Sequence, residues 1–465
     1  MSRIVIVGAG ISGLATAFEI RRRAAAAGTP VELTVLEEDA LVGGKVRTRR
    51  EEGYLCEWGV QAFLDNSPPT LELAHDLGLD PVLRRASPEA KKRWIYSRGA
   101  LRPLPESPPA FLKSRLVSWR GKLRMACEPF IGRRKDGVDE TLAEFARRRL
   151  GREALEVLIG PMVSGIFAGD PTNLSVKSAF PKVAVLEQKH GSLIRGMIAL
   201  KKARGGPASA GPAGVLTSFD DGMATPCLAL ARELGEAVRL GHAVAGLARD
   251  GAGWTVRLAG DAAPLRADAV VLAVPAYVQR RLLAPLDAAA ADLLGQVPYP
   301  TLAVLCLGYR RDEVAHPLDG FGYLIPRREG VTLLGALFES TLFAGRAPAG
   351  HVLVRAMIGG ATNPEVAALD DAGLLAAVRA DLATTAGITA APVFERIYRH
   401  EAAIPQYTPG HAARIEELAA RAVKLGPLLL TGNAYRGISF NDCVRNARDV
   451  ADEALALVRR ASAAA

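Results

Sequence analysis

The chain has 465 residues, of which 49% are hydrophobic and 23% are charged, and its formal net charge is +9. This length and composition predict a folded protein with two or three domains and a large core, and they exclude a disordered chain. No apolar stretch reaches the roughly 18 residues that a membrane-spanning helix needs, so we expect any contact with a membrane to be peripheral.

The five cysteines are widely spaced, and no two of them form a C-x-x-C pair. An odd number without such a pair predicts neither a disulfide framework nor a metal site, and it fits a reducing cytoplasm. The first predicted strand begins almost at the N-terminus, which leaves no room for a secretory leader. We therefore expect a cytoplasmic protein.

Much of the positive charge is local, in basic clusters at residues 91–93, 115–124, 133–135 and 147–149. Such clusters suit anionic partners, although solvated surface charge is the alternative for any one of them. No nucleic-acid motif accompanies the clusters and no aromatic residues are interleaved with them, so a nucleic-acid partner is not expected.

The chain begins with a predicted strand, turn and helix. The apolar residues 4–7 lead into a G-x-G-x-x-G motif at Gly8, Gly10 and Gly13, and a helical pattern follows. Gly8 permits a tight turn, Gly10 lets the backbone approach a pyrophosphate, and Gly13 lets the helix pack closely on the strand. A second apolar strand ends at Glu37, where a ribose hydroxyl would need an acceptor. The order of these elements predicts a dinucleotide-binding βαβ unit.

A second glycine pair follows shortly after this acid. Gly43 and Gly44 precede Lys45 and Arg47, either of which could neutralise phosphate. A nicotinamide site does not need such a pair, which therefore points to a flavin. The small-residue bend at residues 57–63 could lie against the isoalloxazine ring, and a simple hairpin turn is the alternative.

Three distant segments are expected to form one nucleotide-binding domain: residues 1–70, 219–297 and 427–465. The second segment contains a predicted hairpin at residues 249–251 and a buried-looking strand at residues 269–275. The third ends in an amphipathic helix over residues 441–460.

The remaining segments are predicted to form two further domains. A substrate domain is assigned to residues 71–97, 182–218 and 298–426. A mixed or antiparallel sheet is predicted there by strand candidates at residues 301–309, 321–326, 332–339 and 351–359. A tract rich in Gly, Pro, Ala and Ser at residues 205–214 predicts a mobile surface loop.

Residues 98–181 mix basic and apolar positions. Such a segment could form helices that lie on an anionic membrane, with apolar tips buried and Lys and Arg at the headgroups. An ordinary helical subdomain whose apolar residues all face inward explains the same pattern equally well.

Further motifs occur in order along the chain, at residues 165–170, 219–223, 320–326, 404–411 and 432–443. Together with the N-terminal glycines they make the chain resemble, over nearly its whole length, the flavin-dependent amine oxidase superfamily and, within it, the oxygen-dependent protoporphyrinogen oxidases. The resemblance implies an α/β fold with a discontinuous FAD-binding Rossmann-like domain, a mixed-sheet substrate domain and an α-helical membrane-associating domain.

The resemblance also implies FAD as the cofactor, held by residues at the matching positions. These are Gly8, Ala9, Gly10, Ile11, Ser12, Gly13, Glu37, Glu38, Gly44, Lys45, Gly59, Val60, Gln61, Ala62, Val244, Ile438, Ser439 and Phe440.

For the substrate, the resemblance implies contacts from Arg93, Gly165, Phe321, Gly322, Leu324, Leu337 and Met357. The guanidinium of Arg93 suits a propionate carboxylate. The apolar side chains would enclose a tetrapyrrole, and the backbone of Gly165 would lie beside its pyrrole nitrogens. No side chain is expected to act as a catalytic acid or base, and no metal is expected.

The implied activity is the six-electron oxidation of protoporphyrinogen IX to protoporphyrin IX, with oxygen as acceptor and hydrogen peroxide as product. Coproporphyrinogen III is the alternative substrate, and a non-enzymatic carrier on the same fold is the alternative of a different class. The other expected partners are an anionic membrane at the inner face of the cell membrane, a downstream ferrochelatase and a second copy of the chain in a homodimer.

Overall fold

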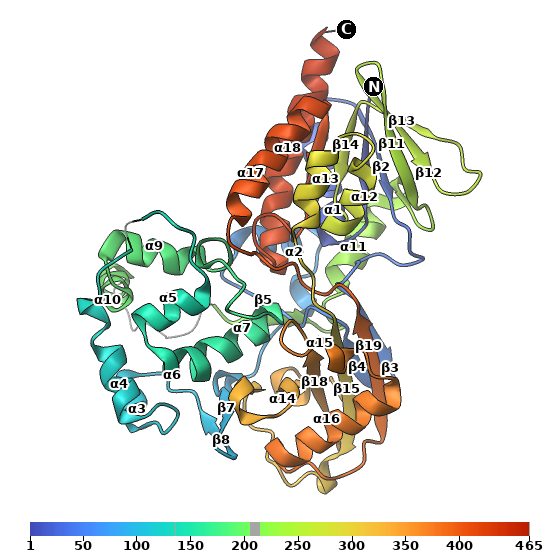
Figure 1. Cartoon of the computed structure of the whole chain (residues 1–465). Helices are drawn as coiled ribbons and strands as arrows, with labels where there is room; N and C mark the ends of the chain where they lie inside the picture. The colour runs from blue at the N-terminus through green and yellow to red at the C-terminus, as the bar shows by residue number, and fades with distance from the viewer. Residues whose placement is uncertain (135, 205–213, 465) are drawn as a thin grey trace.

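The computed structural model describes residues 1–134, 136–204 and 214–464. Two large sheets organise the chain: a parallel sheet in the upper part of the molecule in Figure 1 and a mixed sheet in the lower part, with a group of helices beside them. Residues 205–213 of the predicted surface loop lie outside the described residues.

The parallel sheet has the strand order β10-β2-β1-β14-β20. Its strands are β1 (Ser2–Val7), β2 (Val31–Leu36), β10 (Val238–Arg239), β14 (Ala269–Leu272) and β20 (Leu428–Leu430). They come from the three segments that the sequence assigned to one nucleotide-binding domain. Because both faces of the sheet are covered, β1 is apolar and buried at every position from Ile4 to Val7.

The two faces of β1 pack into different cores. Ile4 and Ile6 pack with α1 (Ile11–Ala26), α11 (Thr225–Leu234) and α18 (Phe440–Ala464). Val5 and Val7 face a three-stranded antiparallel sheet and three helices. These elements are β11 (Val244–Asp250), β12 (Gly253–Leu258), β13 (Leu265–Ala267), α12 (Ala276–Leu283), α13 (Ala288–Gly295) and α17 (His411–Leu425). The hairpin predicted at residues 249–251 is the turn between β11 and β12.

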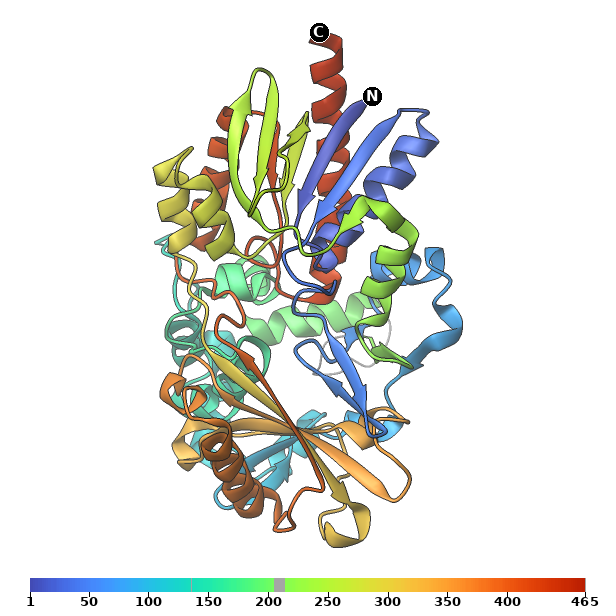
Figure 2. The same cartoon turned by 90° about the vertical axis from the view of Figure 1, so that its right-hand side faces the viewer.

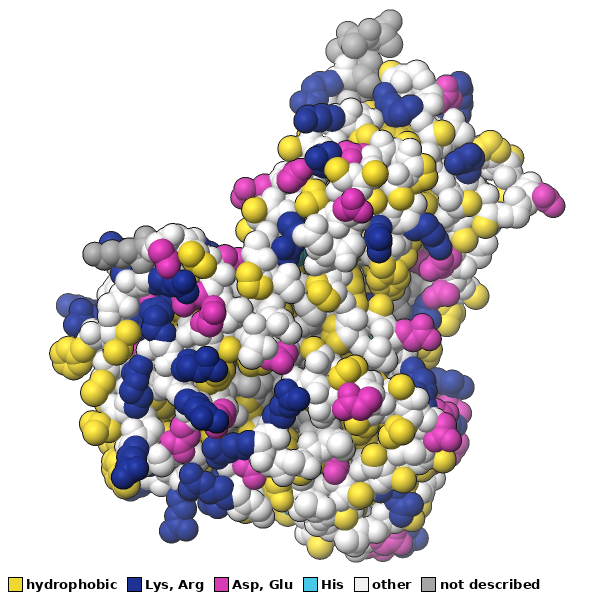
Figure 3. All heavy atoms as spheres, viewed as in Figure 1, with side chains coloured by type: hydrophobic (Ala, Val, Ile, Leu, Met, Phe, Trp, Pro, Cys, Tyr) yellow, Lys and Arg dark blue, Asp and Glu magenta, His cyan; other side chains and the backbone are white. Residues whose placement is uncertain are grey.

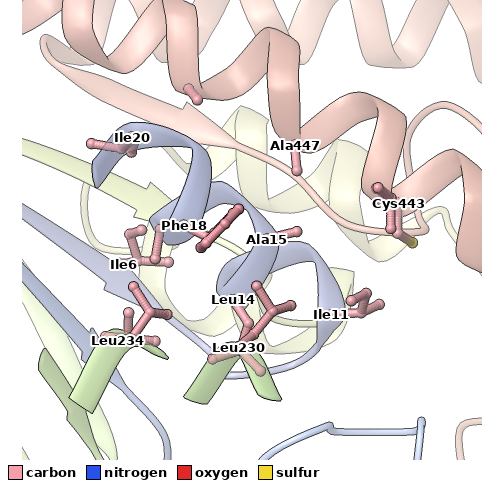
Figure 4. Close-up of a cluster of buried hydrophobic side chains, with 14 of the residues drawn as sticks. Ile6, Ile11, Leu14, Ala15, Phe18, Ile20, Leu230, Leu234, Cys443 and Ala447 are labelled. Carbon is pink, nitrogen blue, oxygen red and sulfur yellow. The ribbon is translucent and has the colours of Figure 1, made fainter. Parts of the chain in front are cut away.

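The first helix is enclosed by two others, as Figure 4 shows. Leu14 of α1 lies beside Leu230 of α11, and Ala15 lies on the side of α18 that carries Ala447. Because Ala15 and Ala447 are small and almost completely buried, the two helices can pack closely.

The mixed sheet has the strand order β19-β15-β18-β17-β16-β7-β8, and only β7 and β16 pair in parallel. Its strands are β7 (Trp94–Ser97), β8 (Ala100–Pro103), β15 (Leu302–Arg310), β16 (Gly322–Leu324), β17 (Leu333–Phe338), β18 (His351–Gly359) and β19 (Phe394–His400). The four strands predicted between residues 301 and 359 are therefore confirmed. One face of this sheet is covered by α16 (Asp371–Ala386).

The boundary predicted between residues 97 and 98 falls inside a hairpin. β7 pairs with β8 from Trp94 opposite Pro103 to Ser97 opposite Ala100, so both strands belong to the mixed sheet. The segment before these strands was also predicted to belong to the substrate domain. In the structure, Leu73 and Ala74 of α2 (Pro68–Asp76) instead pack into the core beside α1 and α18. The β7–β8 turn is local, but local patterns could not show that the hairpin joins β16 or that α2 packs on α18, because these partners are more than 200 residues away in the sequence.

Two smaller strand groups connect the large sheets. The hairpin of β3 (Thr48–Glu51) and β4 (Tyr54–Glu57) lies between the two sheets in Figure 2 and packs on the mixed sheet through Tyr54 and Cys56. A second group consists of β5 (Phe63–Leu64), β6 (Leu83–Arg85) and β9 (Leu216–Phe219).

The helical region has its own core, formed by Leu142, Phe145, Val163 and Phe167. Its helices are α3 (Pro108–Lys113), α4 (Trp119–Ala126), α5 (Leu142–Arg149), α6 (Arg152–Ala154), α7 (Gly160–Phe167), α8 (Val176–Ala179), α9 (Pro181–His190) and α10 (Leu193–Arg204). Within the described ranges, no helix is long and apolar enough to cross a membrane.

We expect Gly13→Ala to destabilise the protein strongly. A Cβ atom at Gly13 would lie 1.9 Å from the carbonyl oxygen of Gly8, so α1 would have to move away from β1. The expected loss in the free energy of unfolding is about 3 kcal/mol, measured by urea denaturation of the apoprotein.

Gly10→Ala is the matched control in the same turn. The backbone of Gly10 is extended (φ −72°, ψ 174°), and the nearest atom to a new Cβ lies 3.9 Å away. Its free energy of unfolding should stay within about 1 kcal/mol of the wild-type value. Equal losses for the two variants would contradict the packing argument.

Candidate functional site

The turn between β1 and α1 is built from backbone groups. Gly8 has a φ of +103°, which favours glycine. The N–H of Ala9 donates to Glu37 Oε2 at 2.7 Å, and the carbonyl of Ala9 accepts from the N–H of Gly43 at 2.8 Å. Gly10, at the N-cap of α1, has no side chain to cap the helix. The start of α1 therefore offers N–H groups and the positive end of the helix dipole to an anion.

Glu37 is almost fully buried at the end of β2. Its Oε1 accepts from the N–H of Asp39 at 3.1 Å, while its Oε2 accepts from Ala9. Burial raises the pKa of the Glu37 carboxyl above its ordinary value. The backbone carbonyl of Glu37 accepts a hydrogen bond from the N–H of His242. This bond holds the start of β11, with the buried Val244, beside the end of β2. Glu38, in contrast, is exposed.

The second glycine pair packs against the first. Gly43 has a φ of +105° and forms a bridge with Gly10, and a Cβ at Gly44 would lie 3.5 Å from the Cα of Gly10. Two backbone segments without side chains, at Gly10 and at Gly43–Gly44, therefore lie in direct contact. Gly43 was predicted only as part of the glycine pair that points to a flavin, and Gly44 alone was assigned a cofactor contact.

The two cations after this pair are engaged by protein groups. Lys45 Nζ donates to the carbonyls of Ala402 and Ala403, and burial lowers the pKa of the Lys45 ammonium to about 8. Arg47 forms an ion pair with Asp39. The structure thus gives both residues contacts within the protein, and a phosphate contact for either remains a prediction.

The bend at residues 59–62 is held by the mixed sheet. Arg355 of β18 donates from Nη2 to the carbonyl of Gly59 at 2.6 Å and from Nε to the carbonyl of Glu57 at 3.1 Å. Gln61 Nε2 donates to Glu339 Oε2 at 3.2 Å. The bend therefore has a fixed place against β17 and β18.

The predicted substrate residues on the sheet share one face. Gly322 pairs with Leu337 and Leu324 pairs with Gly335, which in turn lies opposite Met357. Directly paired residues point to the same side of a sheet, so these side chains lie on the face opposite α16. We call it the α7 face, because α7 contacts β16 and β17.

Three further predicted residues adjoin the α7 face. A Cβ at Gly165 of α7 would lie 2.9 Å from Leu324, so the helix backbone meets this side chain directly. Phe321 packs in one cluster with Leu337 and with Ala62 of the bend. The structure therefore brings the predicted cofactor bend and the predicted substrate residues together.

Arg93 lies at the edge of this group. Its guanidinium carbon is 5.5 Å from the centre of the Phe321 ring, and its side chain is exposed. Among the described residues, no carboxylate forms an ion pair with Arg93. The guanidinium is thus free to bind an anionic group of a ligand.

The C-terminal part of the predicted site lies between two cores. Ile438 packs against the helical core that contains Phe167 of α7, whereas Phe440 packs in the core of α1 and stacks on Phe63 with a ring separation of 5.9 Å. Ser439 Oγ donates to Asp442 Oδ2 at 2.6 Å. This segment therefore joins the nucleotide-binding domain to α7.

Two charged residues of the site were missed by the sequence analysis. Arg355 and Glu339 are buried and lie in or next to otherwise apolar strands. A single charge within a buried apolar strand was the available signal, because such a charge needs a partner.

The residues present fit FAD. The glycine turns leave room for a pyrophosphate beside the uncapped start of α1, and the Glu37 carboxylate can accept a ribose hydroxyl. The bend at residues 59–62 contacts the α7 face through Ala62 and is held by Arg355.

Comparisons with known proteins agree with this geometry. The profile of the family described as flavin containing amine oxidoreductase matches residues 11–455. The chain is 35% identical to the chloroplastic protoporphyrinogen oxidase of Nicotiana tabacum, covering 98% of this chain and 86% of that protein. It is 31% identical to the coproporphyrinogen III oxidase of Bacillus subtilis, covering 97% of each chain.

A solved structure gives a similar result. A protein from Exiguobacterium to which protoporphyrinogen oxidase activity has been attributed superposes with a TM-score of 0.84 at 28% sequence identity. The match covers 97% of this chain and 98% of that chain. The similarity therefore extends over all the domains described above.

Lys45→Met should change how stability depends on pH. The pKa of Lys45 is about 8 in the folded protein, whereas an exposed lysine has a pKa of about 10.4. Between these values the unfolded chain still holds a proton that the folded chain has released. The free energy of unfolding of the wild type, relative to the variant, should therefore rise from about pH 8 to about pH 10. Urea denaturation at a series of pH values measures this difference, and a constant difference would refute the expectation.

Proposed function

Since the chain belongs to the family of flavin-containing amine oxidoreductases, it is an oxidoreductase with FAD as its cofactor, and we propose that it oxidises protoporphyrinogen IX to protoporphyrin IX with dioxygen as acceptor. Six electrons and six protons leave the substrate, and three molecules of dioxygen become three of hydrogen peroxide. The relatives of similar sequence that act on porphyrinogens support this substrate class.

The observation that carries the proposal is the shared orientation of the α7 face and its contact with the bend. Gly322, Leu324, Leu337 and Met357 lie on one side of the sheet, and Phe321 extends this group toward Ala62. An apolar face with a free guanidinium at its edge suits a large ring that carries carboxylates, as a porphyrinogen does.

The chain would contribute position more than acid–base chemistry. Bound FAD supplies the electron acceptor for each two-electron step. Arg93 would bind a propionate and set how the ring enters, while Leu324 and Leu337 would enclose the ring and exclude water. The backbone of Gly165 would lie beside the ring next to Leu324, whose side chain packs directly on it. Holding the reacting groups in a fixed geometry is by itself a large catalytic effect.

Coproporphyrinogen III is the second candidate substrate. It is favoured by the 31% identity, over 97% of both chains, to a coproporphyrinogen III oxidase. The two substrates differ in vinyl against propionate groups, so the free guanidinium of Arg93 could serve either.

We also propose that the helical region binds an anionic membrane at the inner face of the cell membrane. An apolar tip is formed there by Leu112, Trp119, Leu123, Phe130, Met197 and Ile198, and each of these side chains is at least half exposed. Hydrogen bonds from Lys122 Nζ to the carbonyls of Leu112 and Ser114 join α3 to α4, and α10 contacts the short helix that ends at Phe130.

Exposed basic side chains lie close to the apolar tip along the chain. Lys113, Arg115, Arg120 and Arg133 are exposed near it in the sequence. Figure 3 shows hydrophobic and basic side chains together along the left edge, over α3, α4 and α10. This composition suits the boundary between headgroups and acyl chains. The alternative, a region with its apolar residues all inside, applies to the core around Phe145 and not to the tip.

The activity is tested with the purified, FAD-loaded protein and both porphyrinogens in air. We expect porphyrin fluorescence to increase much faster than it does by spontaneous oxidation without the protein. Three molecules of dioxygen should be consumed for each porphyrin formed. We expect the higher kcat/KM with protoporphyrinogen IX. A yellow protein that oxidises neither substrate would refute the proposal, and a colourless protein would favour a carrier without flavin.

Arg93→Ala gives the same assay a residue-level control. Loss of a charged hydrogen bond should raise KM by about 10- to 100-fold and leave kcat within a few-fold. Arg98→Ala, which removes an exposed arginine from the nearby β7–β8 turn, should leave KM unchanged. An unchanged KM for Arg93→Ala would contradict the role assigned to it.

Membrane binding is tested by sedimentation with vesicles that contain phosphatidylglycerol. The double variant Trp119→Ser, Phe130→Ser should bind at least tenfold more weakly, because both side chains lose a large apolar area that enters the membrane. Val423→Ser is the control, since Val423 is 78% exposed but lies on α17, in the other domain. Equal binding of the double variant and the wild type would refute the proposal.

A further inference from the structure

Among the described residues, Lys45 is a largely buried cation without an acidic partner. Its Nζ donates to the carbonyls of Ala402 and Ala403 and lies 5.1 Å from the centre of the Tyr299 ring. No carboxylate in the described part of the chain forms an ion pair with this ammonium, and burial is what shifts its pKa. A charge removed from water usually has an opposite charge beside it, because its burial is otherwise costly.

The titratable groups next to Lys45 do not supply that opposite charge. His400 is neutral at pH 7 and above, because burial lowers its pKa, and its Nε2 donates to the carbonyl of Trp58. Tyr299 keeps its proton, because burial raises the pKa of its phenol. Glu401 follows His400 in the chain, but its side chain is exposed to water, where its charge is screened.

The charged and titratable groups a little further away are cations, paired groups, protonated phenols or exposed acids. They are Arg355, bound to carbonyls of the bend, Arg47, paired with Asp39, Tyr277, whose pKa is raised by burial, and Glu38, which is exposed. Within the described ranges, the ammonium of Lys45 therefore has no fixed counter-charge.

The main chain of Lys45 lies between the two halves of the predicted FAD site. On one side, a Cβ at Gly44 would lie 3.5 Å from the Cα of Gly10, at the start of α1. On the other side, a Cβ at Gly59 would lie 2.7 Å from the carbonyl oxygen of Lys45, so the bend packs directly on this residue. Bound FAD would bring its pyrophosphate to the start of α1, and negative charge would then arrive beside the segment that carries the ammonium.

Burial also affects the proton of this side chain. It lowers the pKa of the Lys45 ammonium to about 8, so part of the apoprotein carries a neutral amine in mildly alkaline solution. A negative charge that arrives nearby favours the protonated form. Proton binding at Nζ and the binding of an anion beside it therefore strengthen each other.

We propose that the pyrophosphate of bound FAD is the counter-charge of Lys45, and that the neutral amine takes up a proton from the solvent when the cofactor binds. The step adds one proton to Nζ and changes no other bond. The affinity for FAD should therefore fall in alkaline solution, where that proton is scarce. The inference needs only the cofactor and does not rest on the proposed porphyrinogen substrate.

The pH dependence of FAD binding tests the proposal. Kd for FAD is measured on the apoprotein by quenching of flavin fluorescence, at constant ionic strength between pH 7 and pH 9. In the wild type, Kd should rise roughly five- to tenfold over this range. Calorimetry at pH 8.5, in two buffers with different heats of protonation, should show the uptake of about half a proton or more for each FAD bound.

Two substitutions separate the charge of Lys45 from its packing. Lys45→Arg stays charged over the whole range, so its Kd should not depend on pH and its binding should take up no proton. Lys45→Met is never charged, so its Kd should be about tenfold above the wild-type value at pH 7 and equally independent of pH. His400→Gln is the matched control: glutamine can still donate to the carbonyl of Trp58, and the wild-type pH dependence should remain.

A constant wild-type Kd without proton uptake would overturn the proposal, and so would the wild-type pH dependence in both Lys45→Met and Lys45→Arg. A side chain that only supports residues 402–403 gives the first of these results. If Lys45→Met does not fold, Lys45→Arg decides alone. Failure of the proposed function is seen separately, as a protein that binds FAD but oxidises no porphyrinogen, and it leaves this test unaffected.

Discussion

The carbonyl oxygen of Gly8 lies so close to α1 that residue 13 can have no side chain, and the rest of the nucleotide-binding domain depends on this contact. It brings the start of α1 over the end of β1. There the N–H of Ala9 donates to the Glu37 carboxylate, and the carbonyl of Ala9 accepts from the N–H of Gly43. On its other side α1 packs against α18 through small residues. One steric constraint thus fixes the turn and the acid relative to one another, and α18 covers the helix that this constraint holds in place.

The mixed sheet depends on strand register in a comparable way. Gly322, Leu337 and Arg355 lie in one row across three strands, so the residue that holds the bend belongs to the same side of the sheet as the α7 face. A shift of one residue would turn this row toward α16. Because Arg355 binds the main chain at residues 57 and 59, the sheet also determines where the bend lies.

Local signals in the sequence were sufficient for the glycine turns, the strands at residues 301–359 and the last helix, because each depends on spacing within a short segment. Arg355 and Glu339 were missed because their meaning depends on which strands pair and on the path of the bend. The boundary at residue 97 was misplaced for the same reason, since β7 and β8 are completed by β16, more than 200 residues later. In residues 98–181 the sequence could not separate an inward core from an exposed tip, and the structure contains both.

The order of strands in the parallel sheet also constrains how the chain folds during synthesis. β1 and β2 are made first, but β14 joins β1 only after residue 269, and α18 covers the first core only when the last residues have been made. Non-local pairings of this kind are slow to form, and they leave apolar strand surface uncovered in the meantime. The helical region and most of the mixed sheet are complete earlier, so they can fold while the glycine turn still waits for its domain. A ribosome-bound chain shortened before α18 should therefore contain a folded mixed sheet and helical region but an unfinished parallel sheet.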